Sequence, residues 1–474
     1  MLYLFLLVVL FLLPAFYLLY LFNREELNLP PSPPELPIIG NLYQVGKLPH
    51  RSFQALSWAF NASLFWEGSD KIMKTHDLAF RPQAKALEVI TYQYRDLAFC
   101  PYGEYWKQVR KICVVELLSQ KRVQSFQFVR EQEVAKLVEK IKRSCLDGAV
   151  INLSRMLLSV SNNMISRTAL GRVYEEESGK KNFGDLAKGW IDLLGSLCFK
   201  DTVPSLGWMD VLSGFNARLD STFRALDEFL DQVIEQHRES ENYDEQDFVN
   251  ILLRLQKDGS LGLDLTPDNI KAILMSMFVG GTDTTAATLE WAMAELVRNP
   301  SIMRKAQEEI RRVAGEKSEV CESDVNEMSF LKCIMKESIR LHSVAIIMRE
   351  TRSTAKLGGY DIPRKTRVLI STWGIHRDPN VWDKPEEFIP ERFADSSIDF
   401  LDGQLMPFGG GRRVCPGMRL AIAEMECVLA NLLYWFDWEL PNGEVPQDLD
   451  MSEVNSVVIR KKAPLLLMPR LHSP

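Results

Sequence analysis

One long helical segment constrains the fold of this chain more than any other feature of its sequence. The run Thr266–Asp268 supplies a threonine N-cap followed by proline at the first helical position. No proline follows until Asn299-Pro300, so the helix is predicted to run from Pro267 to Arg298. A helix of this length would extend ~48 Å, as wide as a large domain. The rest of the chain must therefore pack around it.

Helical periodicity dominates the remaining sequence, and the strands are short. Further helices are predicted at Glu104–Glu116, Ser125–Lys142, Leu219–Glu239, Met303–Ala314, Leu331–Leu341 and Met418–Phe436. Short strands are predicted at Lys356–Ile362, Thr366–Ser371 and Val457–Leu467. We therefore predict a mainly α fold with small β-sheets. No linker, low-complexity tract or repeat divides residues 46–474, which are predicted to form one domain.

The composition is that of a globular protein with a large core, because 46% of the 474 residues are hydrophobic. A net charge of -7 gives no basic footprint, so we expect no nucleic-acid partner. The eight cysteines are scattered and contain no CxxC pair. That spacing argues against a disulfide framework or a zinc ribbon and favours a reducing compartment.

The N-terminus has the composition of a membrane anchor. Residues 1–22 carry no charged side chain and, as a helix, would span ~33 Å, enough to cross a bilayer core. A cleaved signal peptide is the alternative, but the run lacks a basic n-region and an A-x-A-like cleavage site. We predict a transmembrane helix at 1–22, followed at 23–45 by a linker whose proline-rich part, Leu29–Asn41, is a stiff hinge.

The loop PFGGGRRVCPG, Pro407–Gly417, places a single cysteine directly before a predicted helix. It contains the pattern F-x-x-G-x-R-x-C-x-G. The N-terminus of a helix favours a thiolate, and glycines allow the backbone to aim N–H groups at sulfur. The alternatives are an ordinary turn that leads into a helix and a loop that holds Cys415 as a metal ligand.

A second motif, GGTDTT at Gly280–Thr285, lies at the middle of the long helix. Two interior glycines cost about 1 kcal/mol each relative to alanine, so they need a reason. One interpretation is close packing against a neighbouring helix. The other is a widened groove in which Asp283 and Thr284 act as an acid–alcohol pair that relays protons.

At the cysteine loop the chain resembles the cytochrome P-450 family of haem-thiolate monooxygenases. The resemblance implies the fold of that family and a bound haem b. Cys415 would be the axial ligand of the haem iron, and Arg413 would bind a haem propionate, within a loop that Phe408 and Gly411 help to define. A thiolate ligand pushes electron density toward the iron and favours O–O cleavage.

The central helix carries the family's A/G-G-x-D/E-T-T/S motif, which implies that Asp283 and Thr284 deliver protons. The family also has an E-x-x-R pair, here Glu337 and Arg340 in KESIR, which it buries and joins to an arginine from P-E-R-F, here Arg392. Taken alone, such a pair would more often be a weak surface contact. The resemblance implies a structural role for this trio.

Three more residues match propionate-binding positions of the family. These are Trp106 and Arg110 in YGEYWKQVRKI and Arg349 in the MRET segment. From the residues alone, a core tryptophan next to a solvated arginine is the simpler interpretation. The residues expected to line the substrate pocket are Leu97–Tyr102, Met275–Val279, Val344–Ile347 and Asn455–Val458.

The markers PSPPELPIIGN, KTHDLAF, PYGEYW, GYDIP and the DLDM near the end are similar to those of plant microsomal members. The resemblance implies a cytosolic domain anchored in the endoplasmic reticulum membrane, and electrons from NADPH through a flavoprotein reductase. The implied substrate is a hydrophobic small molecule of plant specialised metabolism. The cations that could form the reductase-binding surface are Lys107, Arg110, Lys111, Lys121 and Arg412.

The sequence departs from the family at three places. Residues 59–71 are shorter than the hairpin expected there, residues 343–349 lack the usual prolines, and Asn455-Ser456 replaces an aromatic-glycine pair. From the first departure we hypothesise that the chain takes up haem poorly. Two alternatives to a monooxygenase therefore stay open: a haem-binding but catalytically impaired homologue, and a haem-thiolate dehydratase or isomerase.

Overall fold

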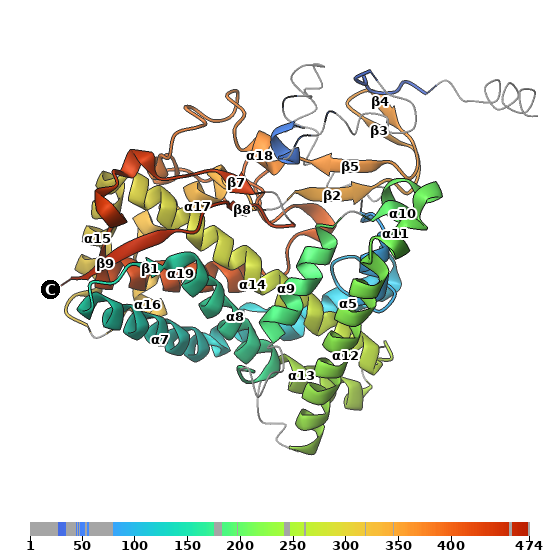
Figure 1. The fold of residues 1–474 in the computed structure, drawn as a ribbon, viewed down its shortest axis with the longest axis horizontal. Helices are drawn as coiled ribbons and strands as arrows, with labels where there is room; N and C mark the ends of the chain where they lie inside the picture. The colour runs from blue at the N-terminus through green and yellow to red at the C-terminus, as the bar shows by residue number, and fades with distance from the viewer. Residues whose placement is uncertain are drawn as a thin grey trace, which may run out of the picture.

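Helix α14 runs from Pro267 to Arg298, the bounds predicted from the sequence. Thr266 caps it, because its hydroxyl accepts from the Asn269 N–H while the Asn269 side chain reaches back to the Thr266 N–H. In the computed structural model this helix crosses the middle of the molecule (Figure 1). Only Pro267, Gly280 and Arg298 are exposed along it, because neighbouring elements cover the rest. Gly280 is far from both ends, so α14 borders an accessible space at its midpoint.

The structure describes residues 27–34, 44, 46, 48–52, 55, 79–174, 183–196, 198–240, 247–259, 262–317, 319–344, 346–454 and 457–472. Besides α14, the α-helices are α4 (Lys85–Ile90), α5 (Glu104–Lys111), α6 (Gln120–Ser125), α7 (Gln127–Leu146), α8 (Leu153–Leu170), α9 (Phe183–Leu194), α10 (Phe199–Thr202), α11 (Met209–Leu212), α12 (Phe215–Glu239), α13 (Phe248–Asp258), α15 (Pro300–Ala314), α16 (Glu322–Val325), α17 (Ser329–Leu341), α18 (Thr372–Ile375) and α19 (Met418–Trp435). Short 3-10 turns and one π-helix, η3 (Ile112–Leu117), connect them.

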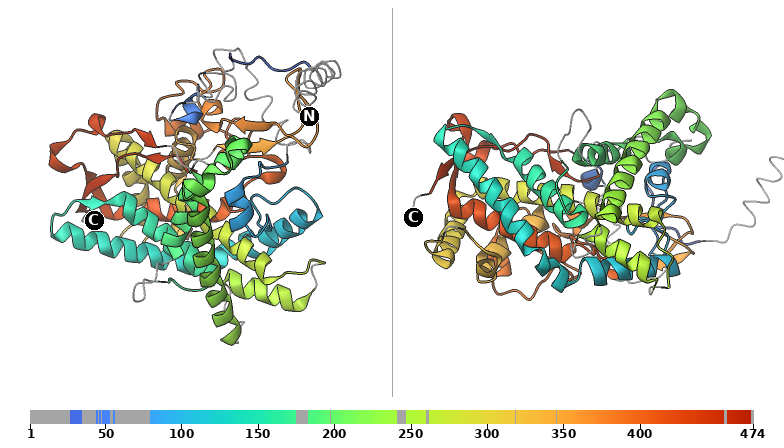
Figure 2. Two further views of the ribbon diagram at one scale, coloured as in Figure 1. Left: turned by 45° about the vertical axis from the view of Figure 1, so that its right-hand side comes forward. Right: turned by 90° about the horizontal axis from the view of Figure 1, so that it is seen from below.

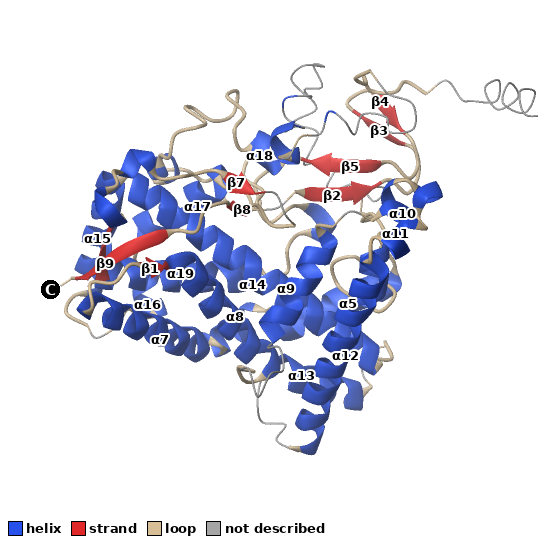
Figure 3. Ribbon diagram, viewed as in Figure 1, coloured by secondary structure: helices blue, strands red, loops and turns tan. Residues whose placement is uncertain are grey.

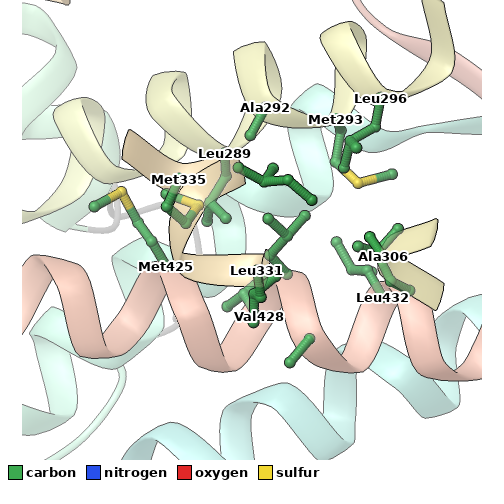
Figure 4. Close-up of a cluster of buried hydrophobic side chains, with 14 of the residues drawn as sticks. Leu289, Ala292, Met293, Leu296, Ala306, Leu331, Met335, Met425, Val428 and Leu432 are labelled. Carbon is green, nitrogen blue, oxygen red and sulfur yellow. The ribbon is translucent and has the colours of Figure 1, made fainter. Parts of the chain in front are cut away.

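The larger of the two main cores lies where α14 meets α15, α17 and α19. Leucine, methionine and alanine side chains from these four helices interlock in it (Figure 4). The labelled members are Leu289, Ala292, Met293 and Leu296 of α14, Ala306 of α15, Leu331 and Met335 of α17, and Met425, Val428 and Leu432 of α19. Helix α7 lies along one side of this core next to α19 (Figure 2). The core fixes α19, and hence the cysteine loop before it, relative to α14.

Within the described residues, the strands form four small antiparallel sheets at the margins of the helices (Figure 3). Their bounds are β1 (Ile151–Asn152), β2 (Ile347–Glu350), β3 (Ala355–Leu357), β4 (Tyr360–Ile362), β5 (Arg367–Ile370), β6 (Phe436–Glu439), β7 (Glu453–Val454), β8 (Arg460–Lys461) and β9 (Leu466–Leu471). The pairs are β2–β5, β3–β4 and β7–β8, and β9 lies between β1 and β6. A mainly α fold with small sheets is therefore confirmed.

The differences from the sequence predictions are local. The predicted helix Glu104–Glu116 is α-helical to Lys111 and then widens into η3, where the Leu118 N–H donates to the Cys113 carbonyl, 2.9 Å away. The strand predicted at Lys356–Ile362 is a hairpin, because Gly358 and Gly359 both adopt positive φ. The strand predicted at Val457–Leu467 is two strands, β8 and β9.

Several sequence predictions fall outside the described residues. They are the anchor helix at 1–22, the shortened segment 59–71 and the Asn455-Ser456 pair, and most of the hinge also falls there. Within the part of the chain that the structure describes, no helix combines the length and the apolar character needed to cross a membrane.

Candidate active site

The cysteine loop is closed by its own backbone. The Cys415 N–H donates to the Phe408 carbonyl, 2.9 Å away, and the Gly409 N–H donates to the Met406 carbonyl, 3.0 Å away. Gly409 and Gly411 have φ values of 72° and 64°, a left-handed conformation that glycine adopts without strain. The loop thus holds Cys415 at the start of α19, as the sequence predicts.

The Cys415 thiol is surrounded by groups that favour its ionised form. Burial is the largest effect and raises its pKa overall, while the backbone N–H groups of Gly417 and Met418 and the charges of Arg110 and Arg81 act in the opposite direction. N–H groups at the first turn of a helix stabilise a thiolate in this way. The side chain is still partly exposed, so its sulfur can reach a ligand.

Arg413, within the loop, is buried, and it makes no hydrogen bond to a carboxylate of the described residues. Its Nε donates to the Ala79 carbonyl, 2.9 Å away, and its Nη2 donates to the Cys100 carbonyl. Its guanidinium lies 4.2 Å from the centre of the Trp106 ring. Burial and the like charge of Arg81 lower the pKa of Arg413 to about 10. A buried arginine whose partners are neutral carbonyls retains capacity for an anion.

The structure brings the other predicted propionate-binding residues to the same place. On α5, Trp106 donates from Nε1 to the Leu97 carbonyl (3.1 Å), and Arg110 donates from Nη2 to the Val414 carbonyl (2.9 Å). Arg349 of β2 is buried and donates to its own neighbour, the Met348 carbonyl, 3.0 Å away. Burial and the charges of Arg81 and Arg413 lower the pKa of Arg349.

Arg81 belongs to this cluster, and the sequence reasoning missed it. Its Nε atom is buried without a hydrogen-bond partner among the described residues. Burial lowers its pKa, while Asp96 and Cys415 act against that shift. It lies in the segment FRP, Phe80–Pro82, to which the sequence analysis assigned no role. We call Arg81, Arg349 and Arg413 the arginine cluster.

The two glycines at the midpoint of α14 differ in their surroundings. A Cβ atom on Gly281 would lie 3.0 Å from the Cδ1 atom of Ile165 on α8, so this glycine permits close helix packing. A Cβ atom on Gly280 would meet nothing within 4 Å, and Gly280 is exposed. The packing interpretation therefore holds for Gly281, and the groove interpretation fits Gly280. The Thr284 hydroxyl borders the same space and donates to the Gly280 carbonyl, 2.6 Å away.

Asp283 is buried next to Thr284 and forms an ion pair with Arg460 of β8, a partner that the sequence did not reveal. Burial raises the pKa of this carboxyl, and Arg460 acts in the opposite direction. An acid with a raised pKa next to an alcohol is suited to proton transfer.

The three residues predicted to form a structural trio, Glu337, Arg340 and Arg392, lie in hydrogen-bond contact. Arg340 donates to both carboxylate oxygens of Glu337, at 2.7 and 2.9 Å, and to the His376 carbonyl at 2.6 Å. Arg392 donates to the same carboxylate at 3.0 Å. Glu337 and Arg340 are fully buried, so the trio joins α17 to the chain around 376–392.

Comparison with known proteins agrees with this geometry. The family model described as Cytochrome P450 matches residues 30–468. The chain belongs to the cytochrome P450 family. It is 47% identical over 95% of its length to a phenylacetaldehyde oxime monooxygenase of Prunus mume, of which 91% is covered. It is also 48% identical over 91% of its length to Cytochrome P450 71A1 of Persea americana, again with 91% covered.

A solved structure shows the same P450 fold. It is a zebra fish cytochrome P450 with abiraterone, with a TM-score of 0.76, 24% identity, and coverage of 90% of this chain and all of that one. Membership of the family implies a haem, and the residues present fit one. The Cys415 sulfur can bind the iron, and the arginine cluster, with its orphaned buried Nε, suits two carboxylates. The chain is thus a P450 oxygenase.

Proposed function

We propose that this chain is a monooxygenase that inserts one oxygen atom of O₂ into a hydrophobic small molecule. The observation that carries the proposal is the convergence of three features: the Cys415 loop, the arginine cluster, and an accessible midpoint of α14 next to an acid–alcohol pair. In the overall reaction, substrate, O₂, two electrons and two protons give hydroxylated product and water. The electrons come from NADPH through a flavoprotein reductase.

Each side chain has a distinct part in the proposed reaction. Bound haem, held by Cys415, supplies the activation of oxygen. The arginine cluster, with Trp106 and Arg110, holds the propionates and thereby orients the cofactor. Asp283 takes a proton from solvent and passes it to the Thr284 hydroxyl, which faces the accessible space beside Gly280.

A plant specialised metabolite is the proposed class of substrate. Two of the relatives are named phenylacetaldehyde oxime monooxygenase and Strychnine-11-hydroxylase, the latter from Strychnos nux-vomica at 43% identity over 94% of this chain. Of the residues expected to line the pocket, Leu97, Met275 and Phe278 are buried hydrophobics. Such a lining favours an aromatic or terpenoid skeleton over a charged metabolite.

We propose that residues 1–22 anchor the enzyme in the endoplasmic reticulum membrane and that residues 46–474 form the cytosolic haem domain. The proposed reductase-binding surface lies on the side of the cysteine loop. There Lys107, Lys111, Lys121 and Arg412 are exposed, and Arg110 is partly buried. Cations on such a surface steer an acidic flavoprotein, so reduction should slow as ionic strength rises.

The test is turnover by the full chain in microsomes that contain an NADPH-dependent reductase, with phenylacetaldehyde oxime as the first probe. The proposal expects NADPH-dependent and O₂-dependent product. Cys415→Ser is the control that removes the proposed ligand. Product without consumption of NADPH and O₂ would instead identify a haem-thiolate dehydratase or isomerase.

The hypothesis of poor haem uptake is tested by the same preparation. A full thiolate-type CO difference spectrum, in proportion to the protein, contradicts it. A weak spectrum together with ligand-induced spectral shifts but no product would identify a catalytically impaired homologue.

A further inference from the structure

The ion pair between Asp283 and Arg460 joins two elements that are far apart in the sequence. Asp283 lies at the midpoint of α14, and Arg460 lies on β8 near the C-terminus. The Arg460 Nη2 donates to the Asp283 Oδ2. Its Nε is buried and has no hydrogen-bond partner among the described residues. Among the described residues, the Arg460 side chain therefore hydrogen-bonds to the Asp283 carboxylate and to no other acceptor.

Arg460 is held in place by its neighbours on both sides. In the β7–β8 ladder it lies opposite Val454. The preceding residue, Ile459, donates its N–H to the Val344 carbonyl (2.9 Å), and its carbonyl accepts from Trp291 Nε1 (3.3 Å). Trp291 is itself on α14, about two turns beyond Asp283. Hydrogen bonds thus hold the strand that carries Arg460 against the helix that carries the acid.

Three charged groups act on the Asp283 carboxyl. Arg460 approaches it from β8, and the exposed Asp192 and Lys188 act on it from α9. Burial raises the pKa of Asp283, as does Asp192, whereas Arg460 and Lys188 lower it. Arg460 is the only one of these groups in hydrogen-bond contact with the acid, so it dominates the orientation of the carboxylate.

We propose that Arg460 is a positioning residue that holds the Asp283 carboxylate ionised and correctly oriented for proton transfer to Thr284. The inference rests on the monooxygenase function proposed above. In it, the carboxylate takes a proton from solvent, and the O–H bond so formed breaks as the proton passes to the Thr284 oxygen, whose own proton moves on. Arg460 itself neither gains nor loses a proton. Without it, burial would raise the pKa of the Asp283 carboxyl further and favour its protonated form.

The experiment compares five variants of the full-length holoenzyme, one of them a matched control, with the wild type. Arg460→Gln removes the charge, Arg460→Lys retains it, and Asp283→Asn and the double variant complete a cycle. Arg311→Gln is the matched control, because Arg311 is similarly half-buried and pairs with Asp437 at 2.9 Å, yet it lies on α15 and has no part in the site. Product formed per NADPH is measured from pH 6 to 9 together with the CO spectrum.

We expect Arg460→Gln to lower product per NADPH about tenfold at pH 7 and to move the acidic limb of the profile upward by about one unit. The acidic limb of the pH profile reports protonation of the Asp283 carboxylate. Removal of the Arg460 cation raises the pKa of this acid, so the limb moves to higher pH. Arg460→Lys should restore most of the coupling, and Arg311→Gln should match the wild type. An unchanged limb in Arg460→Gln, or additive effects of Arg460→Gln and Asp283→Asn, would overturn the proposal.

A second readout does not depend on turnover. Infrared difference spectra at pH 7 should show a protonated carboxyl band in Arg460→Gln that is absent from the Arg460→Gln/Asp283→Asn double variant. If the wild type yields no NADPH-dependent product, the monooxygenase proposal fails, while the infrared comparison still decides the role of Arg460. No difference between the two infrared spectra would refute that role even in an active enzyme.

Discussion

Two groups of arginines in the described part of the chain, the Glu337 trio and the arginine cluster, differ in what balances their charge. Arg340 and Arg392 both bind the Glu337 carboxylate, and backbone carbonyls take up their remaining donors. The arginine cluster near Cys415 has no carboxylate in hydrogen-bond contact among the described residues, and Arg81 keeps an orphaned Nε. The trio is complete within the protein. An anionic ligand would supply such a partner for the cluster.

The comparison separates a structural charge from a functional one. Burying an ion costs several kcal/mol unless a partner of opposite sign compensates it. The trio meets that requirement within the chain, so it stabilises the folded state by itself. In the haem-free protein, the free-energy cost of burying the arginine cluster is only partly compensated. A haem with two propionates would compensate the remainder. Substitutions in the two groups should therefore have different readouts.

The largest expected effect is that of Glu337→Gln. The change leaves two buried guanidinium groups without their carboxylate, which should cost about 3–5 kcal/mol in the free energy of unfolding. A loss of this size removes a large part of the stability of a typical domain. The measurement is the yield of soluble protein and its thermal unfolding. Haem binding would be lost as a consequence of unfolding.

The matched control for that variant is Glu391→Gln. Glu391 also binds a cation, Lys305 at 2.6 Å, but both side chains are about half exposed. An exposed pair contributes about 0–1 kcal/mol, so unfolding should barely change. Equal destabilisation by the two variants would show that the trio is not a special structural centre.

The second prediction concerns Cys415→Ser, which should leave the fold intact while the haem-thiolate signature disappears. The substitution changes one atom in a loop that is held by backbone hydrogen bonds, so stability should change by about 1 kcal/mol or less. The CO difference spectrum and the haem absorbance per protein are measured alongside thermal unfolding. A thiolate spectrum that survives the change would contradict the assignment of Cys415 as the ligand.

The third prediction is that Arg349→Met raises the stability of the haem-free protein and lowers its affinity for haem. The haem-free protein should become more stable, because burial and the charges of Arg81 and Arg413 disfavour this guanidinium. Haem affinity should fall about tenfold with the loss of one charge-assisted contact of about 1.4 kcal/mol. Unfolding of the haem-free chain and haem titration test the two parts. Arg352→Met, at an exposed position two residues after β2, is the control.

Much of the fold and of the candidate site could be predicted from the sequence, because the signals for them lie within a few neighbouring residues. The bounds of α14 follow from the Thr266 cap and from Pro300, both of which act over a few residues. The cysteine loop carries its own glycines and arginine. Membership of the trio and of the propionate site came from the family resemblance, and the structure brings those side chains together as that resemblance implies.

The residues that the sequence did not reveal depend on tertiary contacts. Arg460 lies 177 positions from Asp283, and no periodicity links them. Arg81 is defined by its burial beside Arg349 and Arg413, which only the folded chain produces. The π-helical turn η3 likewise depends on which side chains the surrounding helices bury, with Ile112 and Cys113 inside and Val115 exposed. Local patterns cannot report such long-range partners.

The smallest expected effect tests whether every buried ionisable side chain that lacks a partner marks a ligand-binding site. Glu424 of α19 is buried, and its Oε1 has no partner among the described residues, yet burial raises the pKa of this carboxyl to about 8. A carboxyl can become neutral by taking a proton, whereas a guanidinium cannot. Glu424 therefore needs no ligand, and the arginine cluster does.

Since the folded state keeps the Glu424 proton up to about pH 8 and the unfolded state loses it near pH 4.3, the free energy of unfolding should fall as pH rises between these values. Glu424→Gln removes this dependence, so its curve should be flatter than that of the wild type by about 1 kcal/mol between pH 7 and 8. Chemical unfolding across that range measures the slopes. Parallel curves would mean that Glu424 is ionised in the folded protein, and a cationic partner would then have to be sought for it as well.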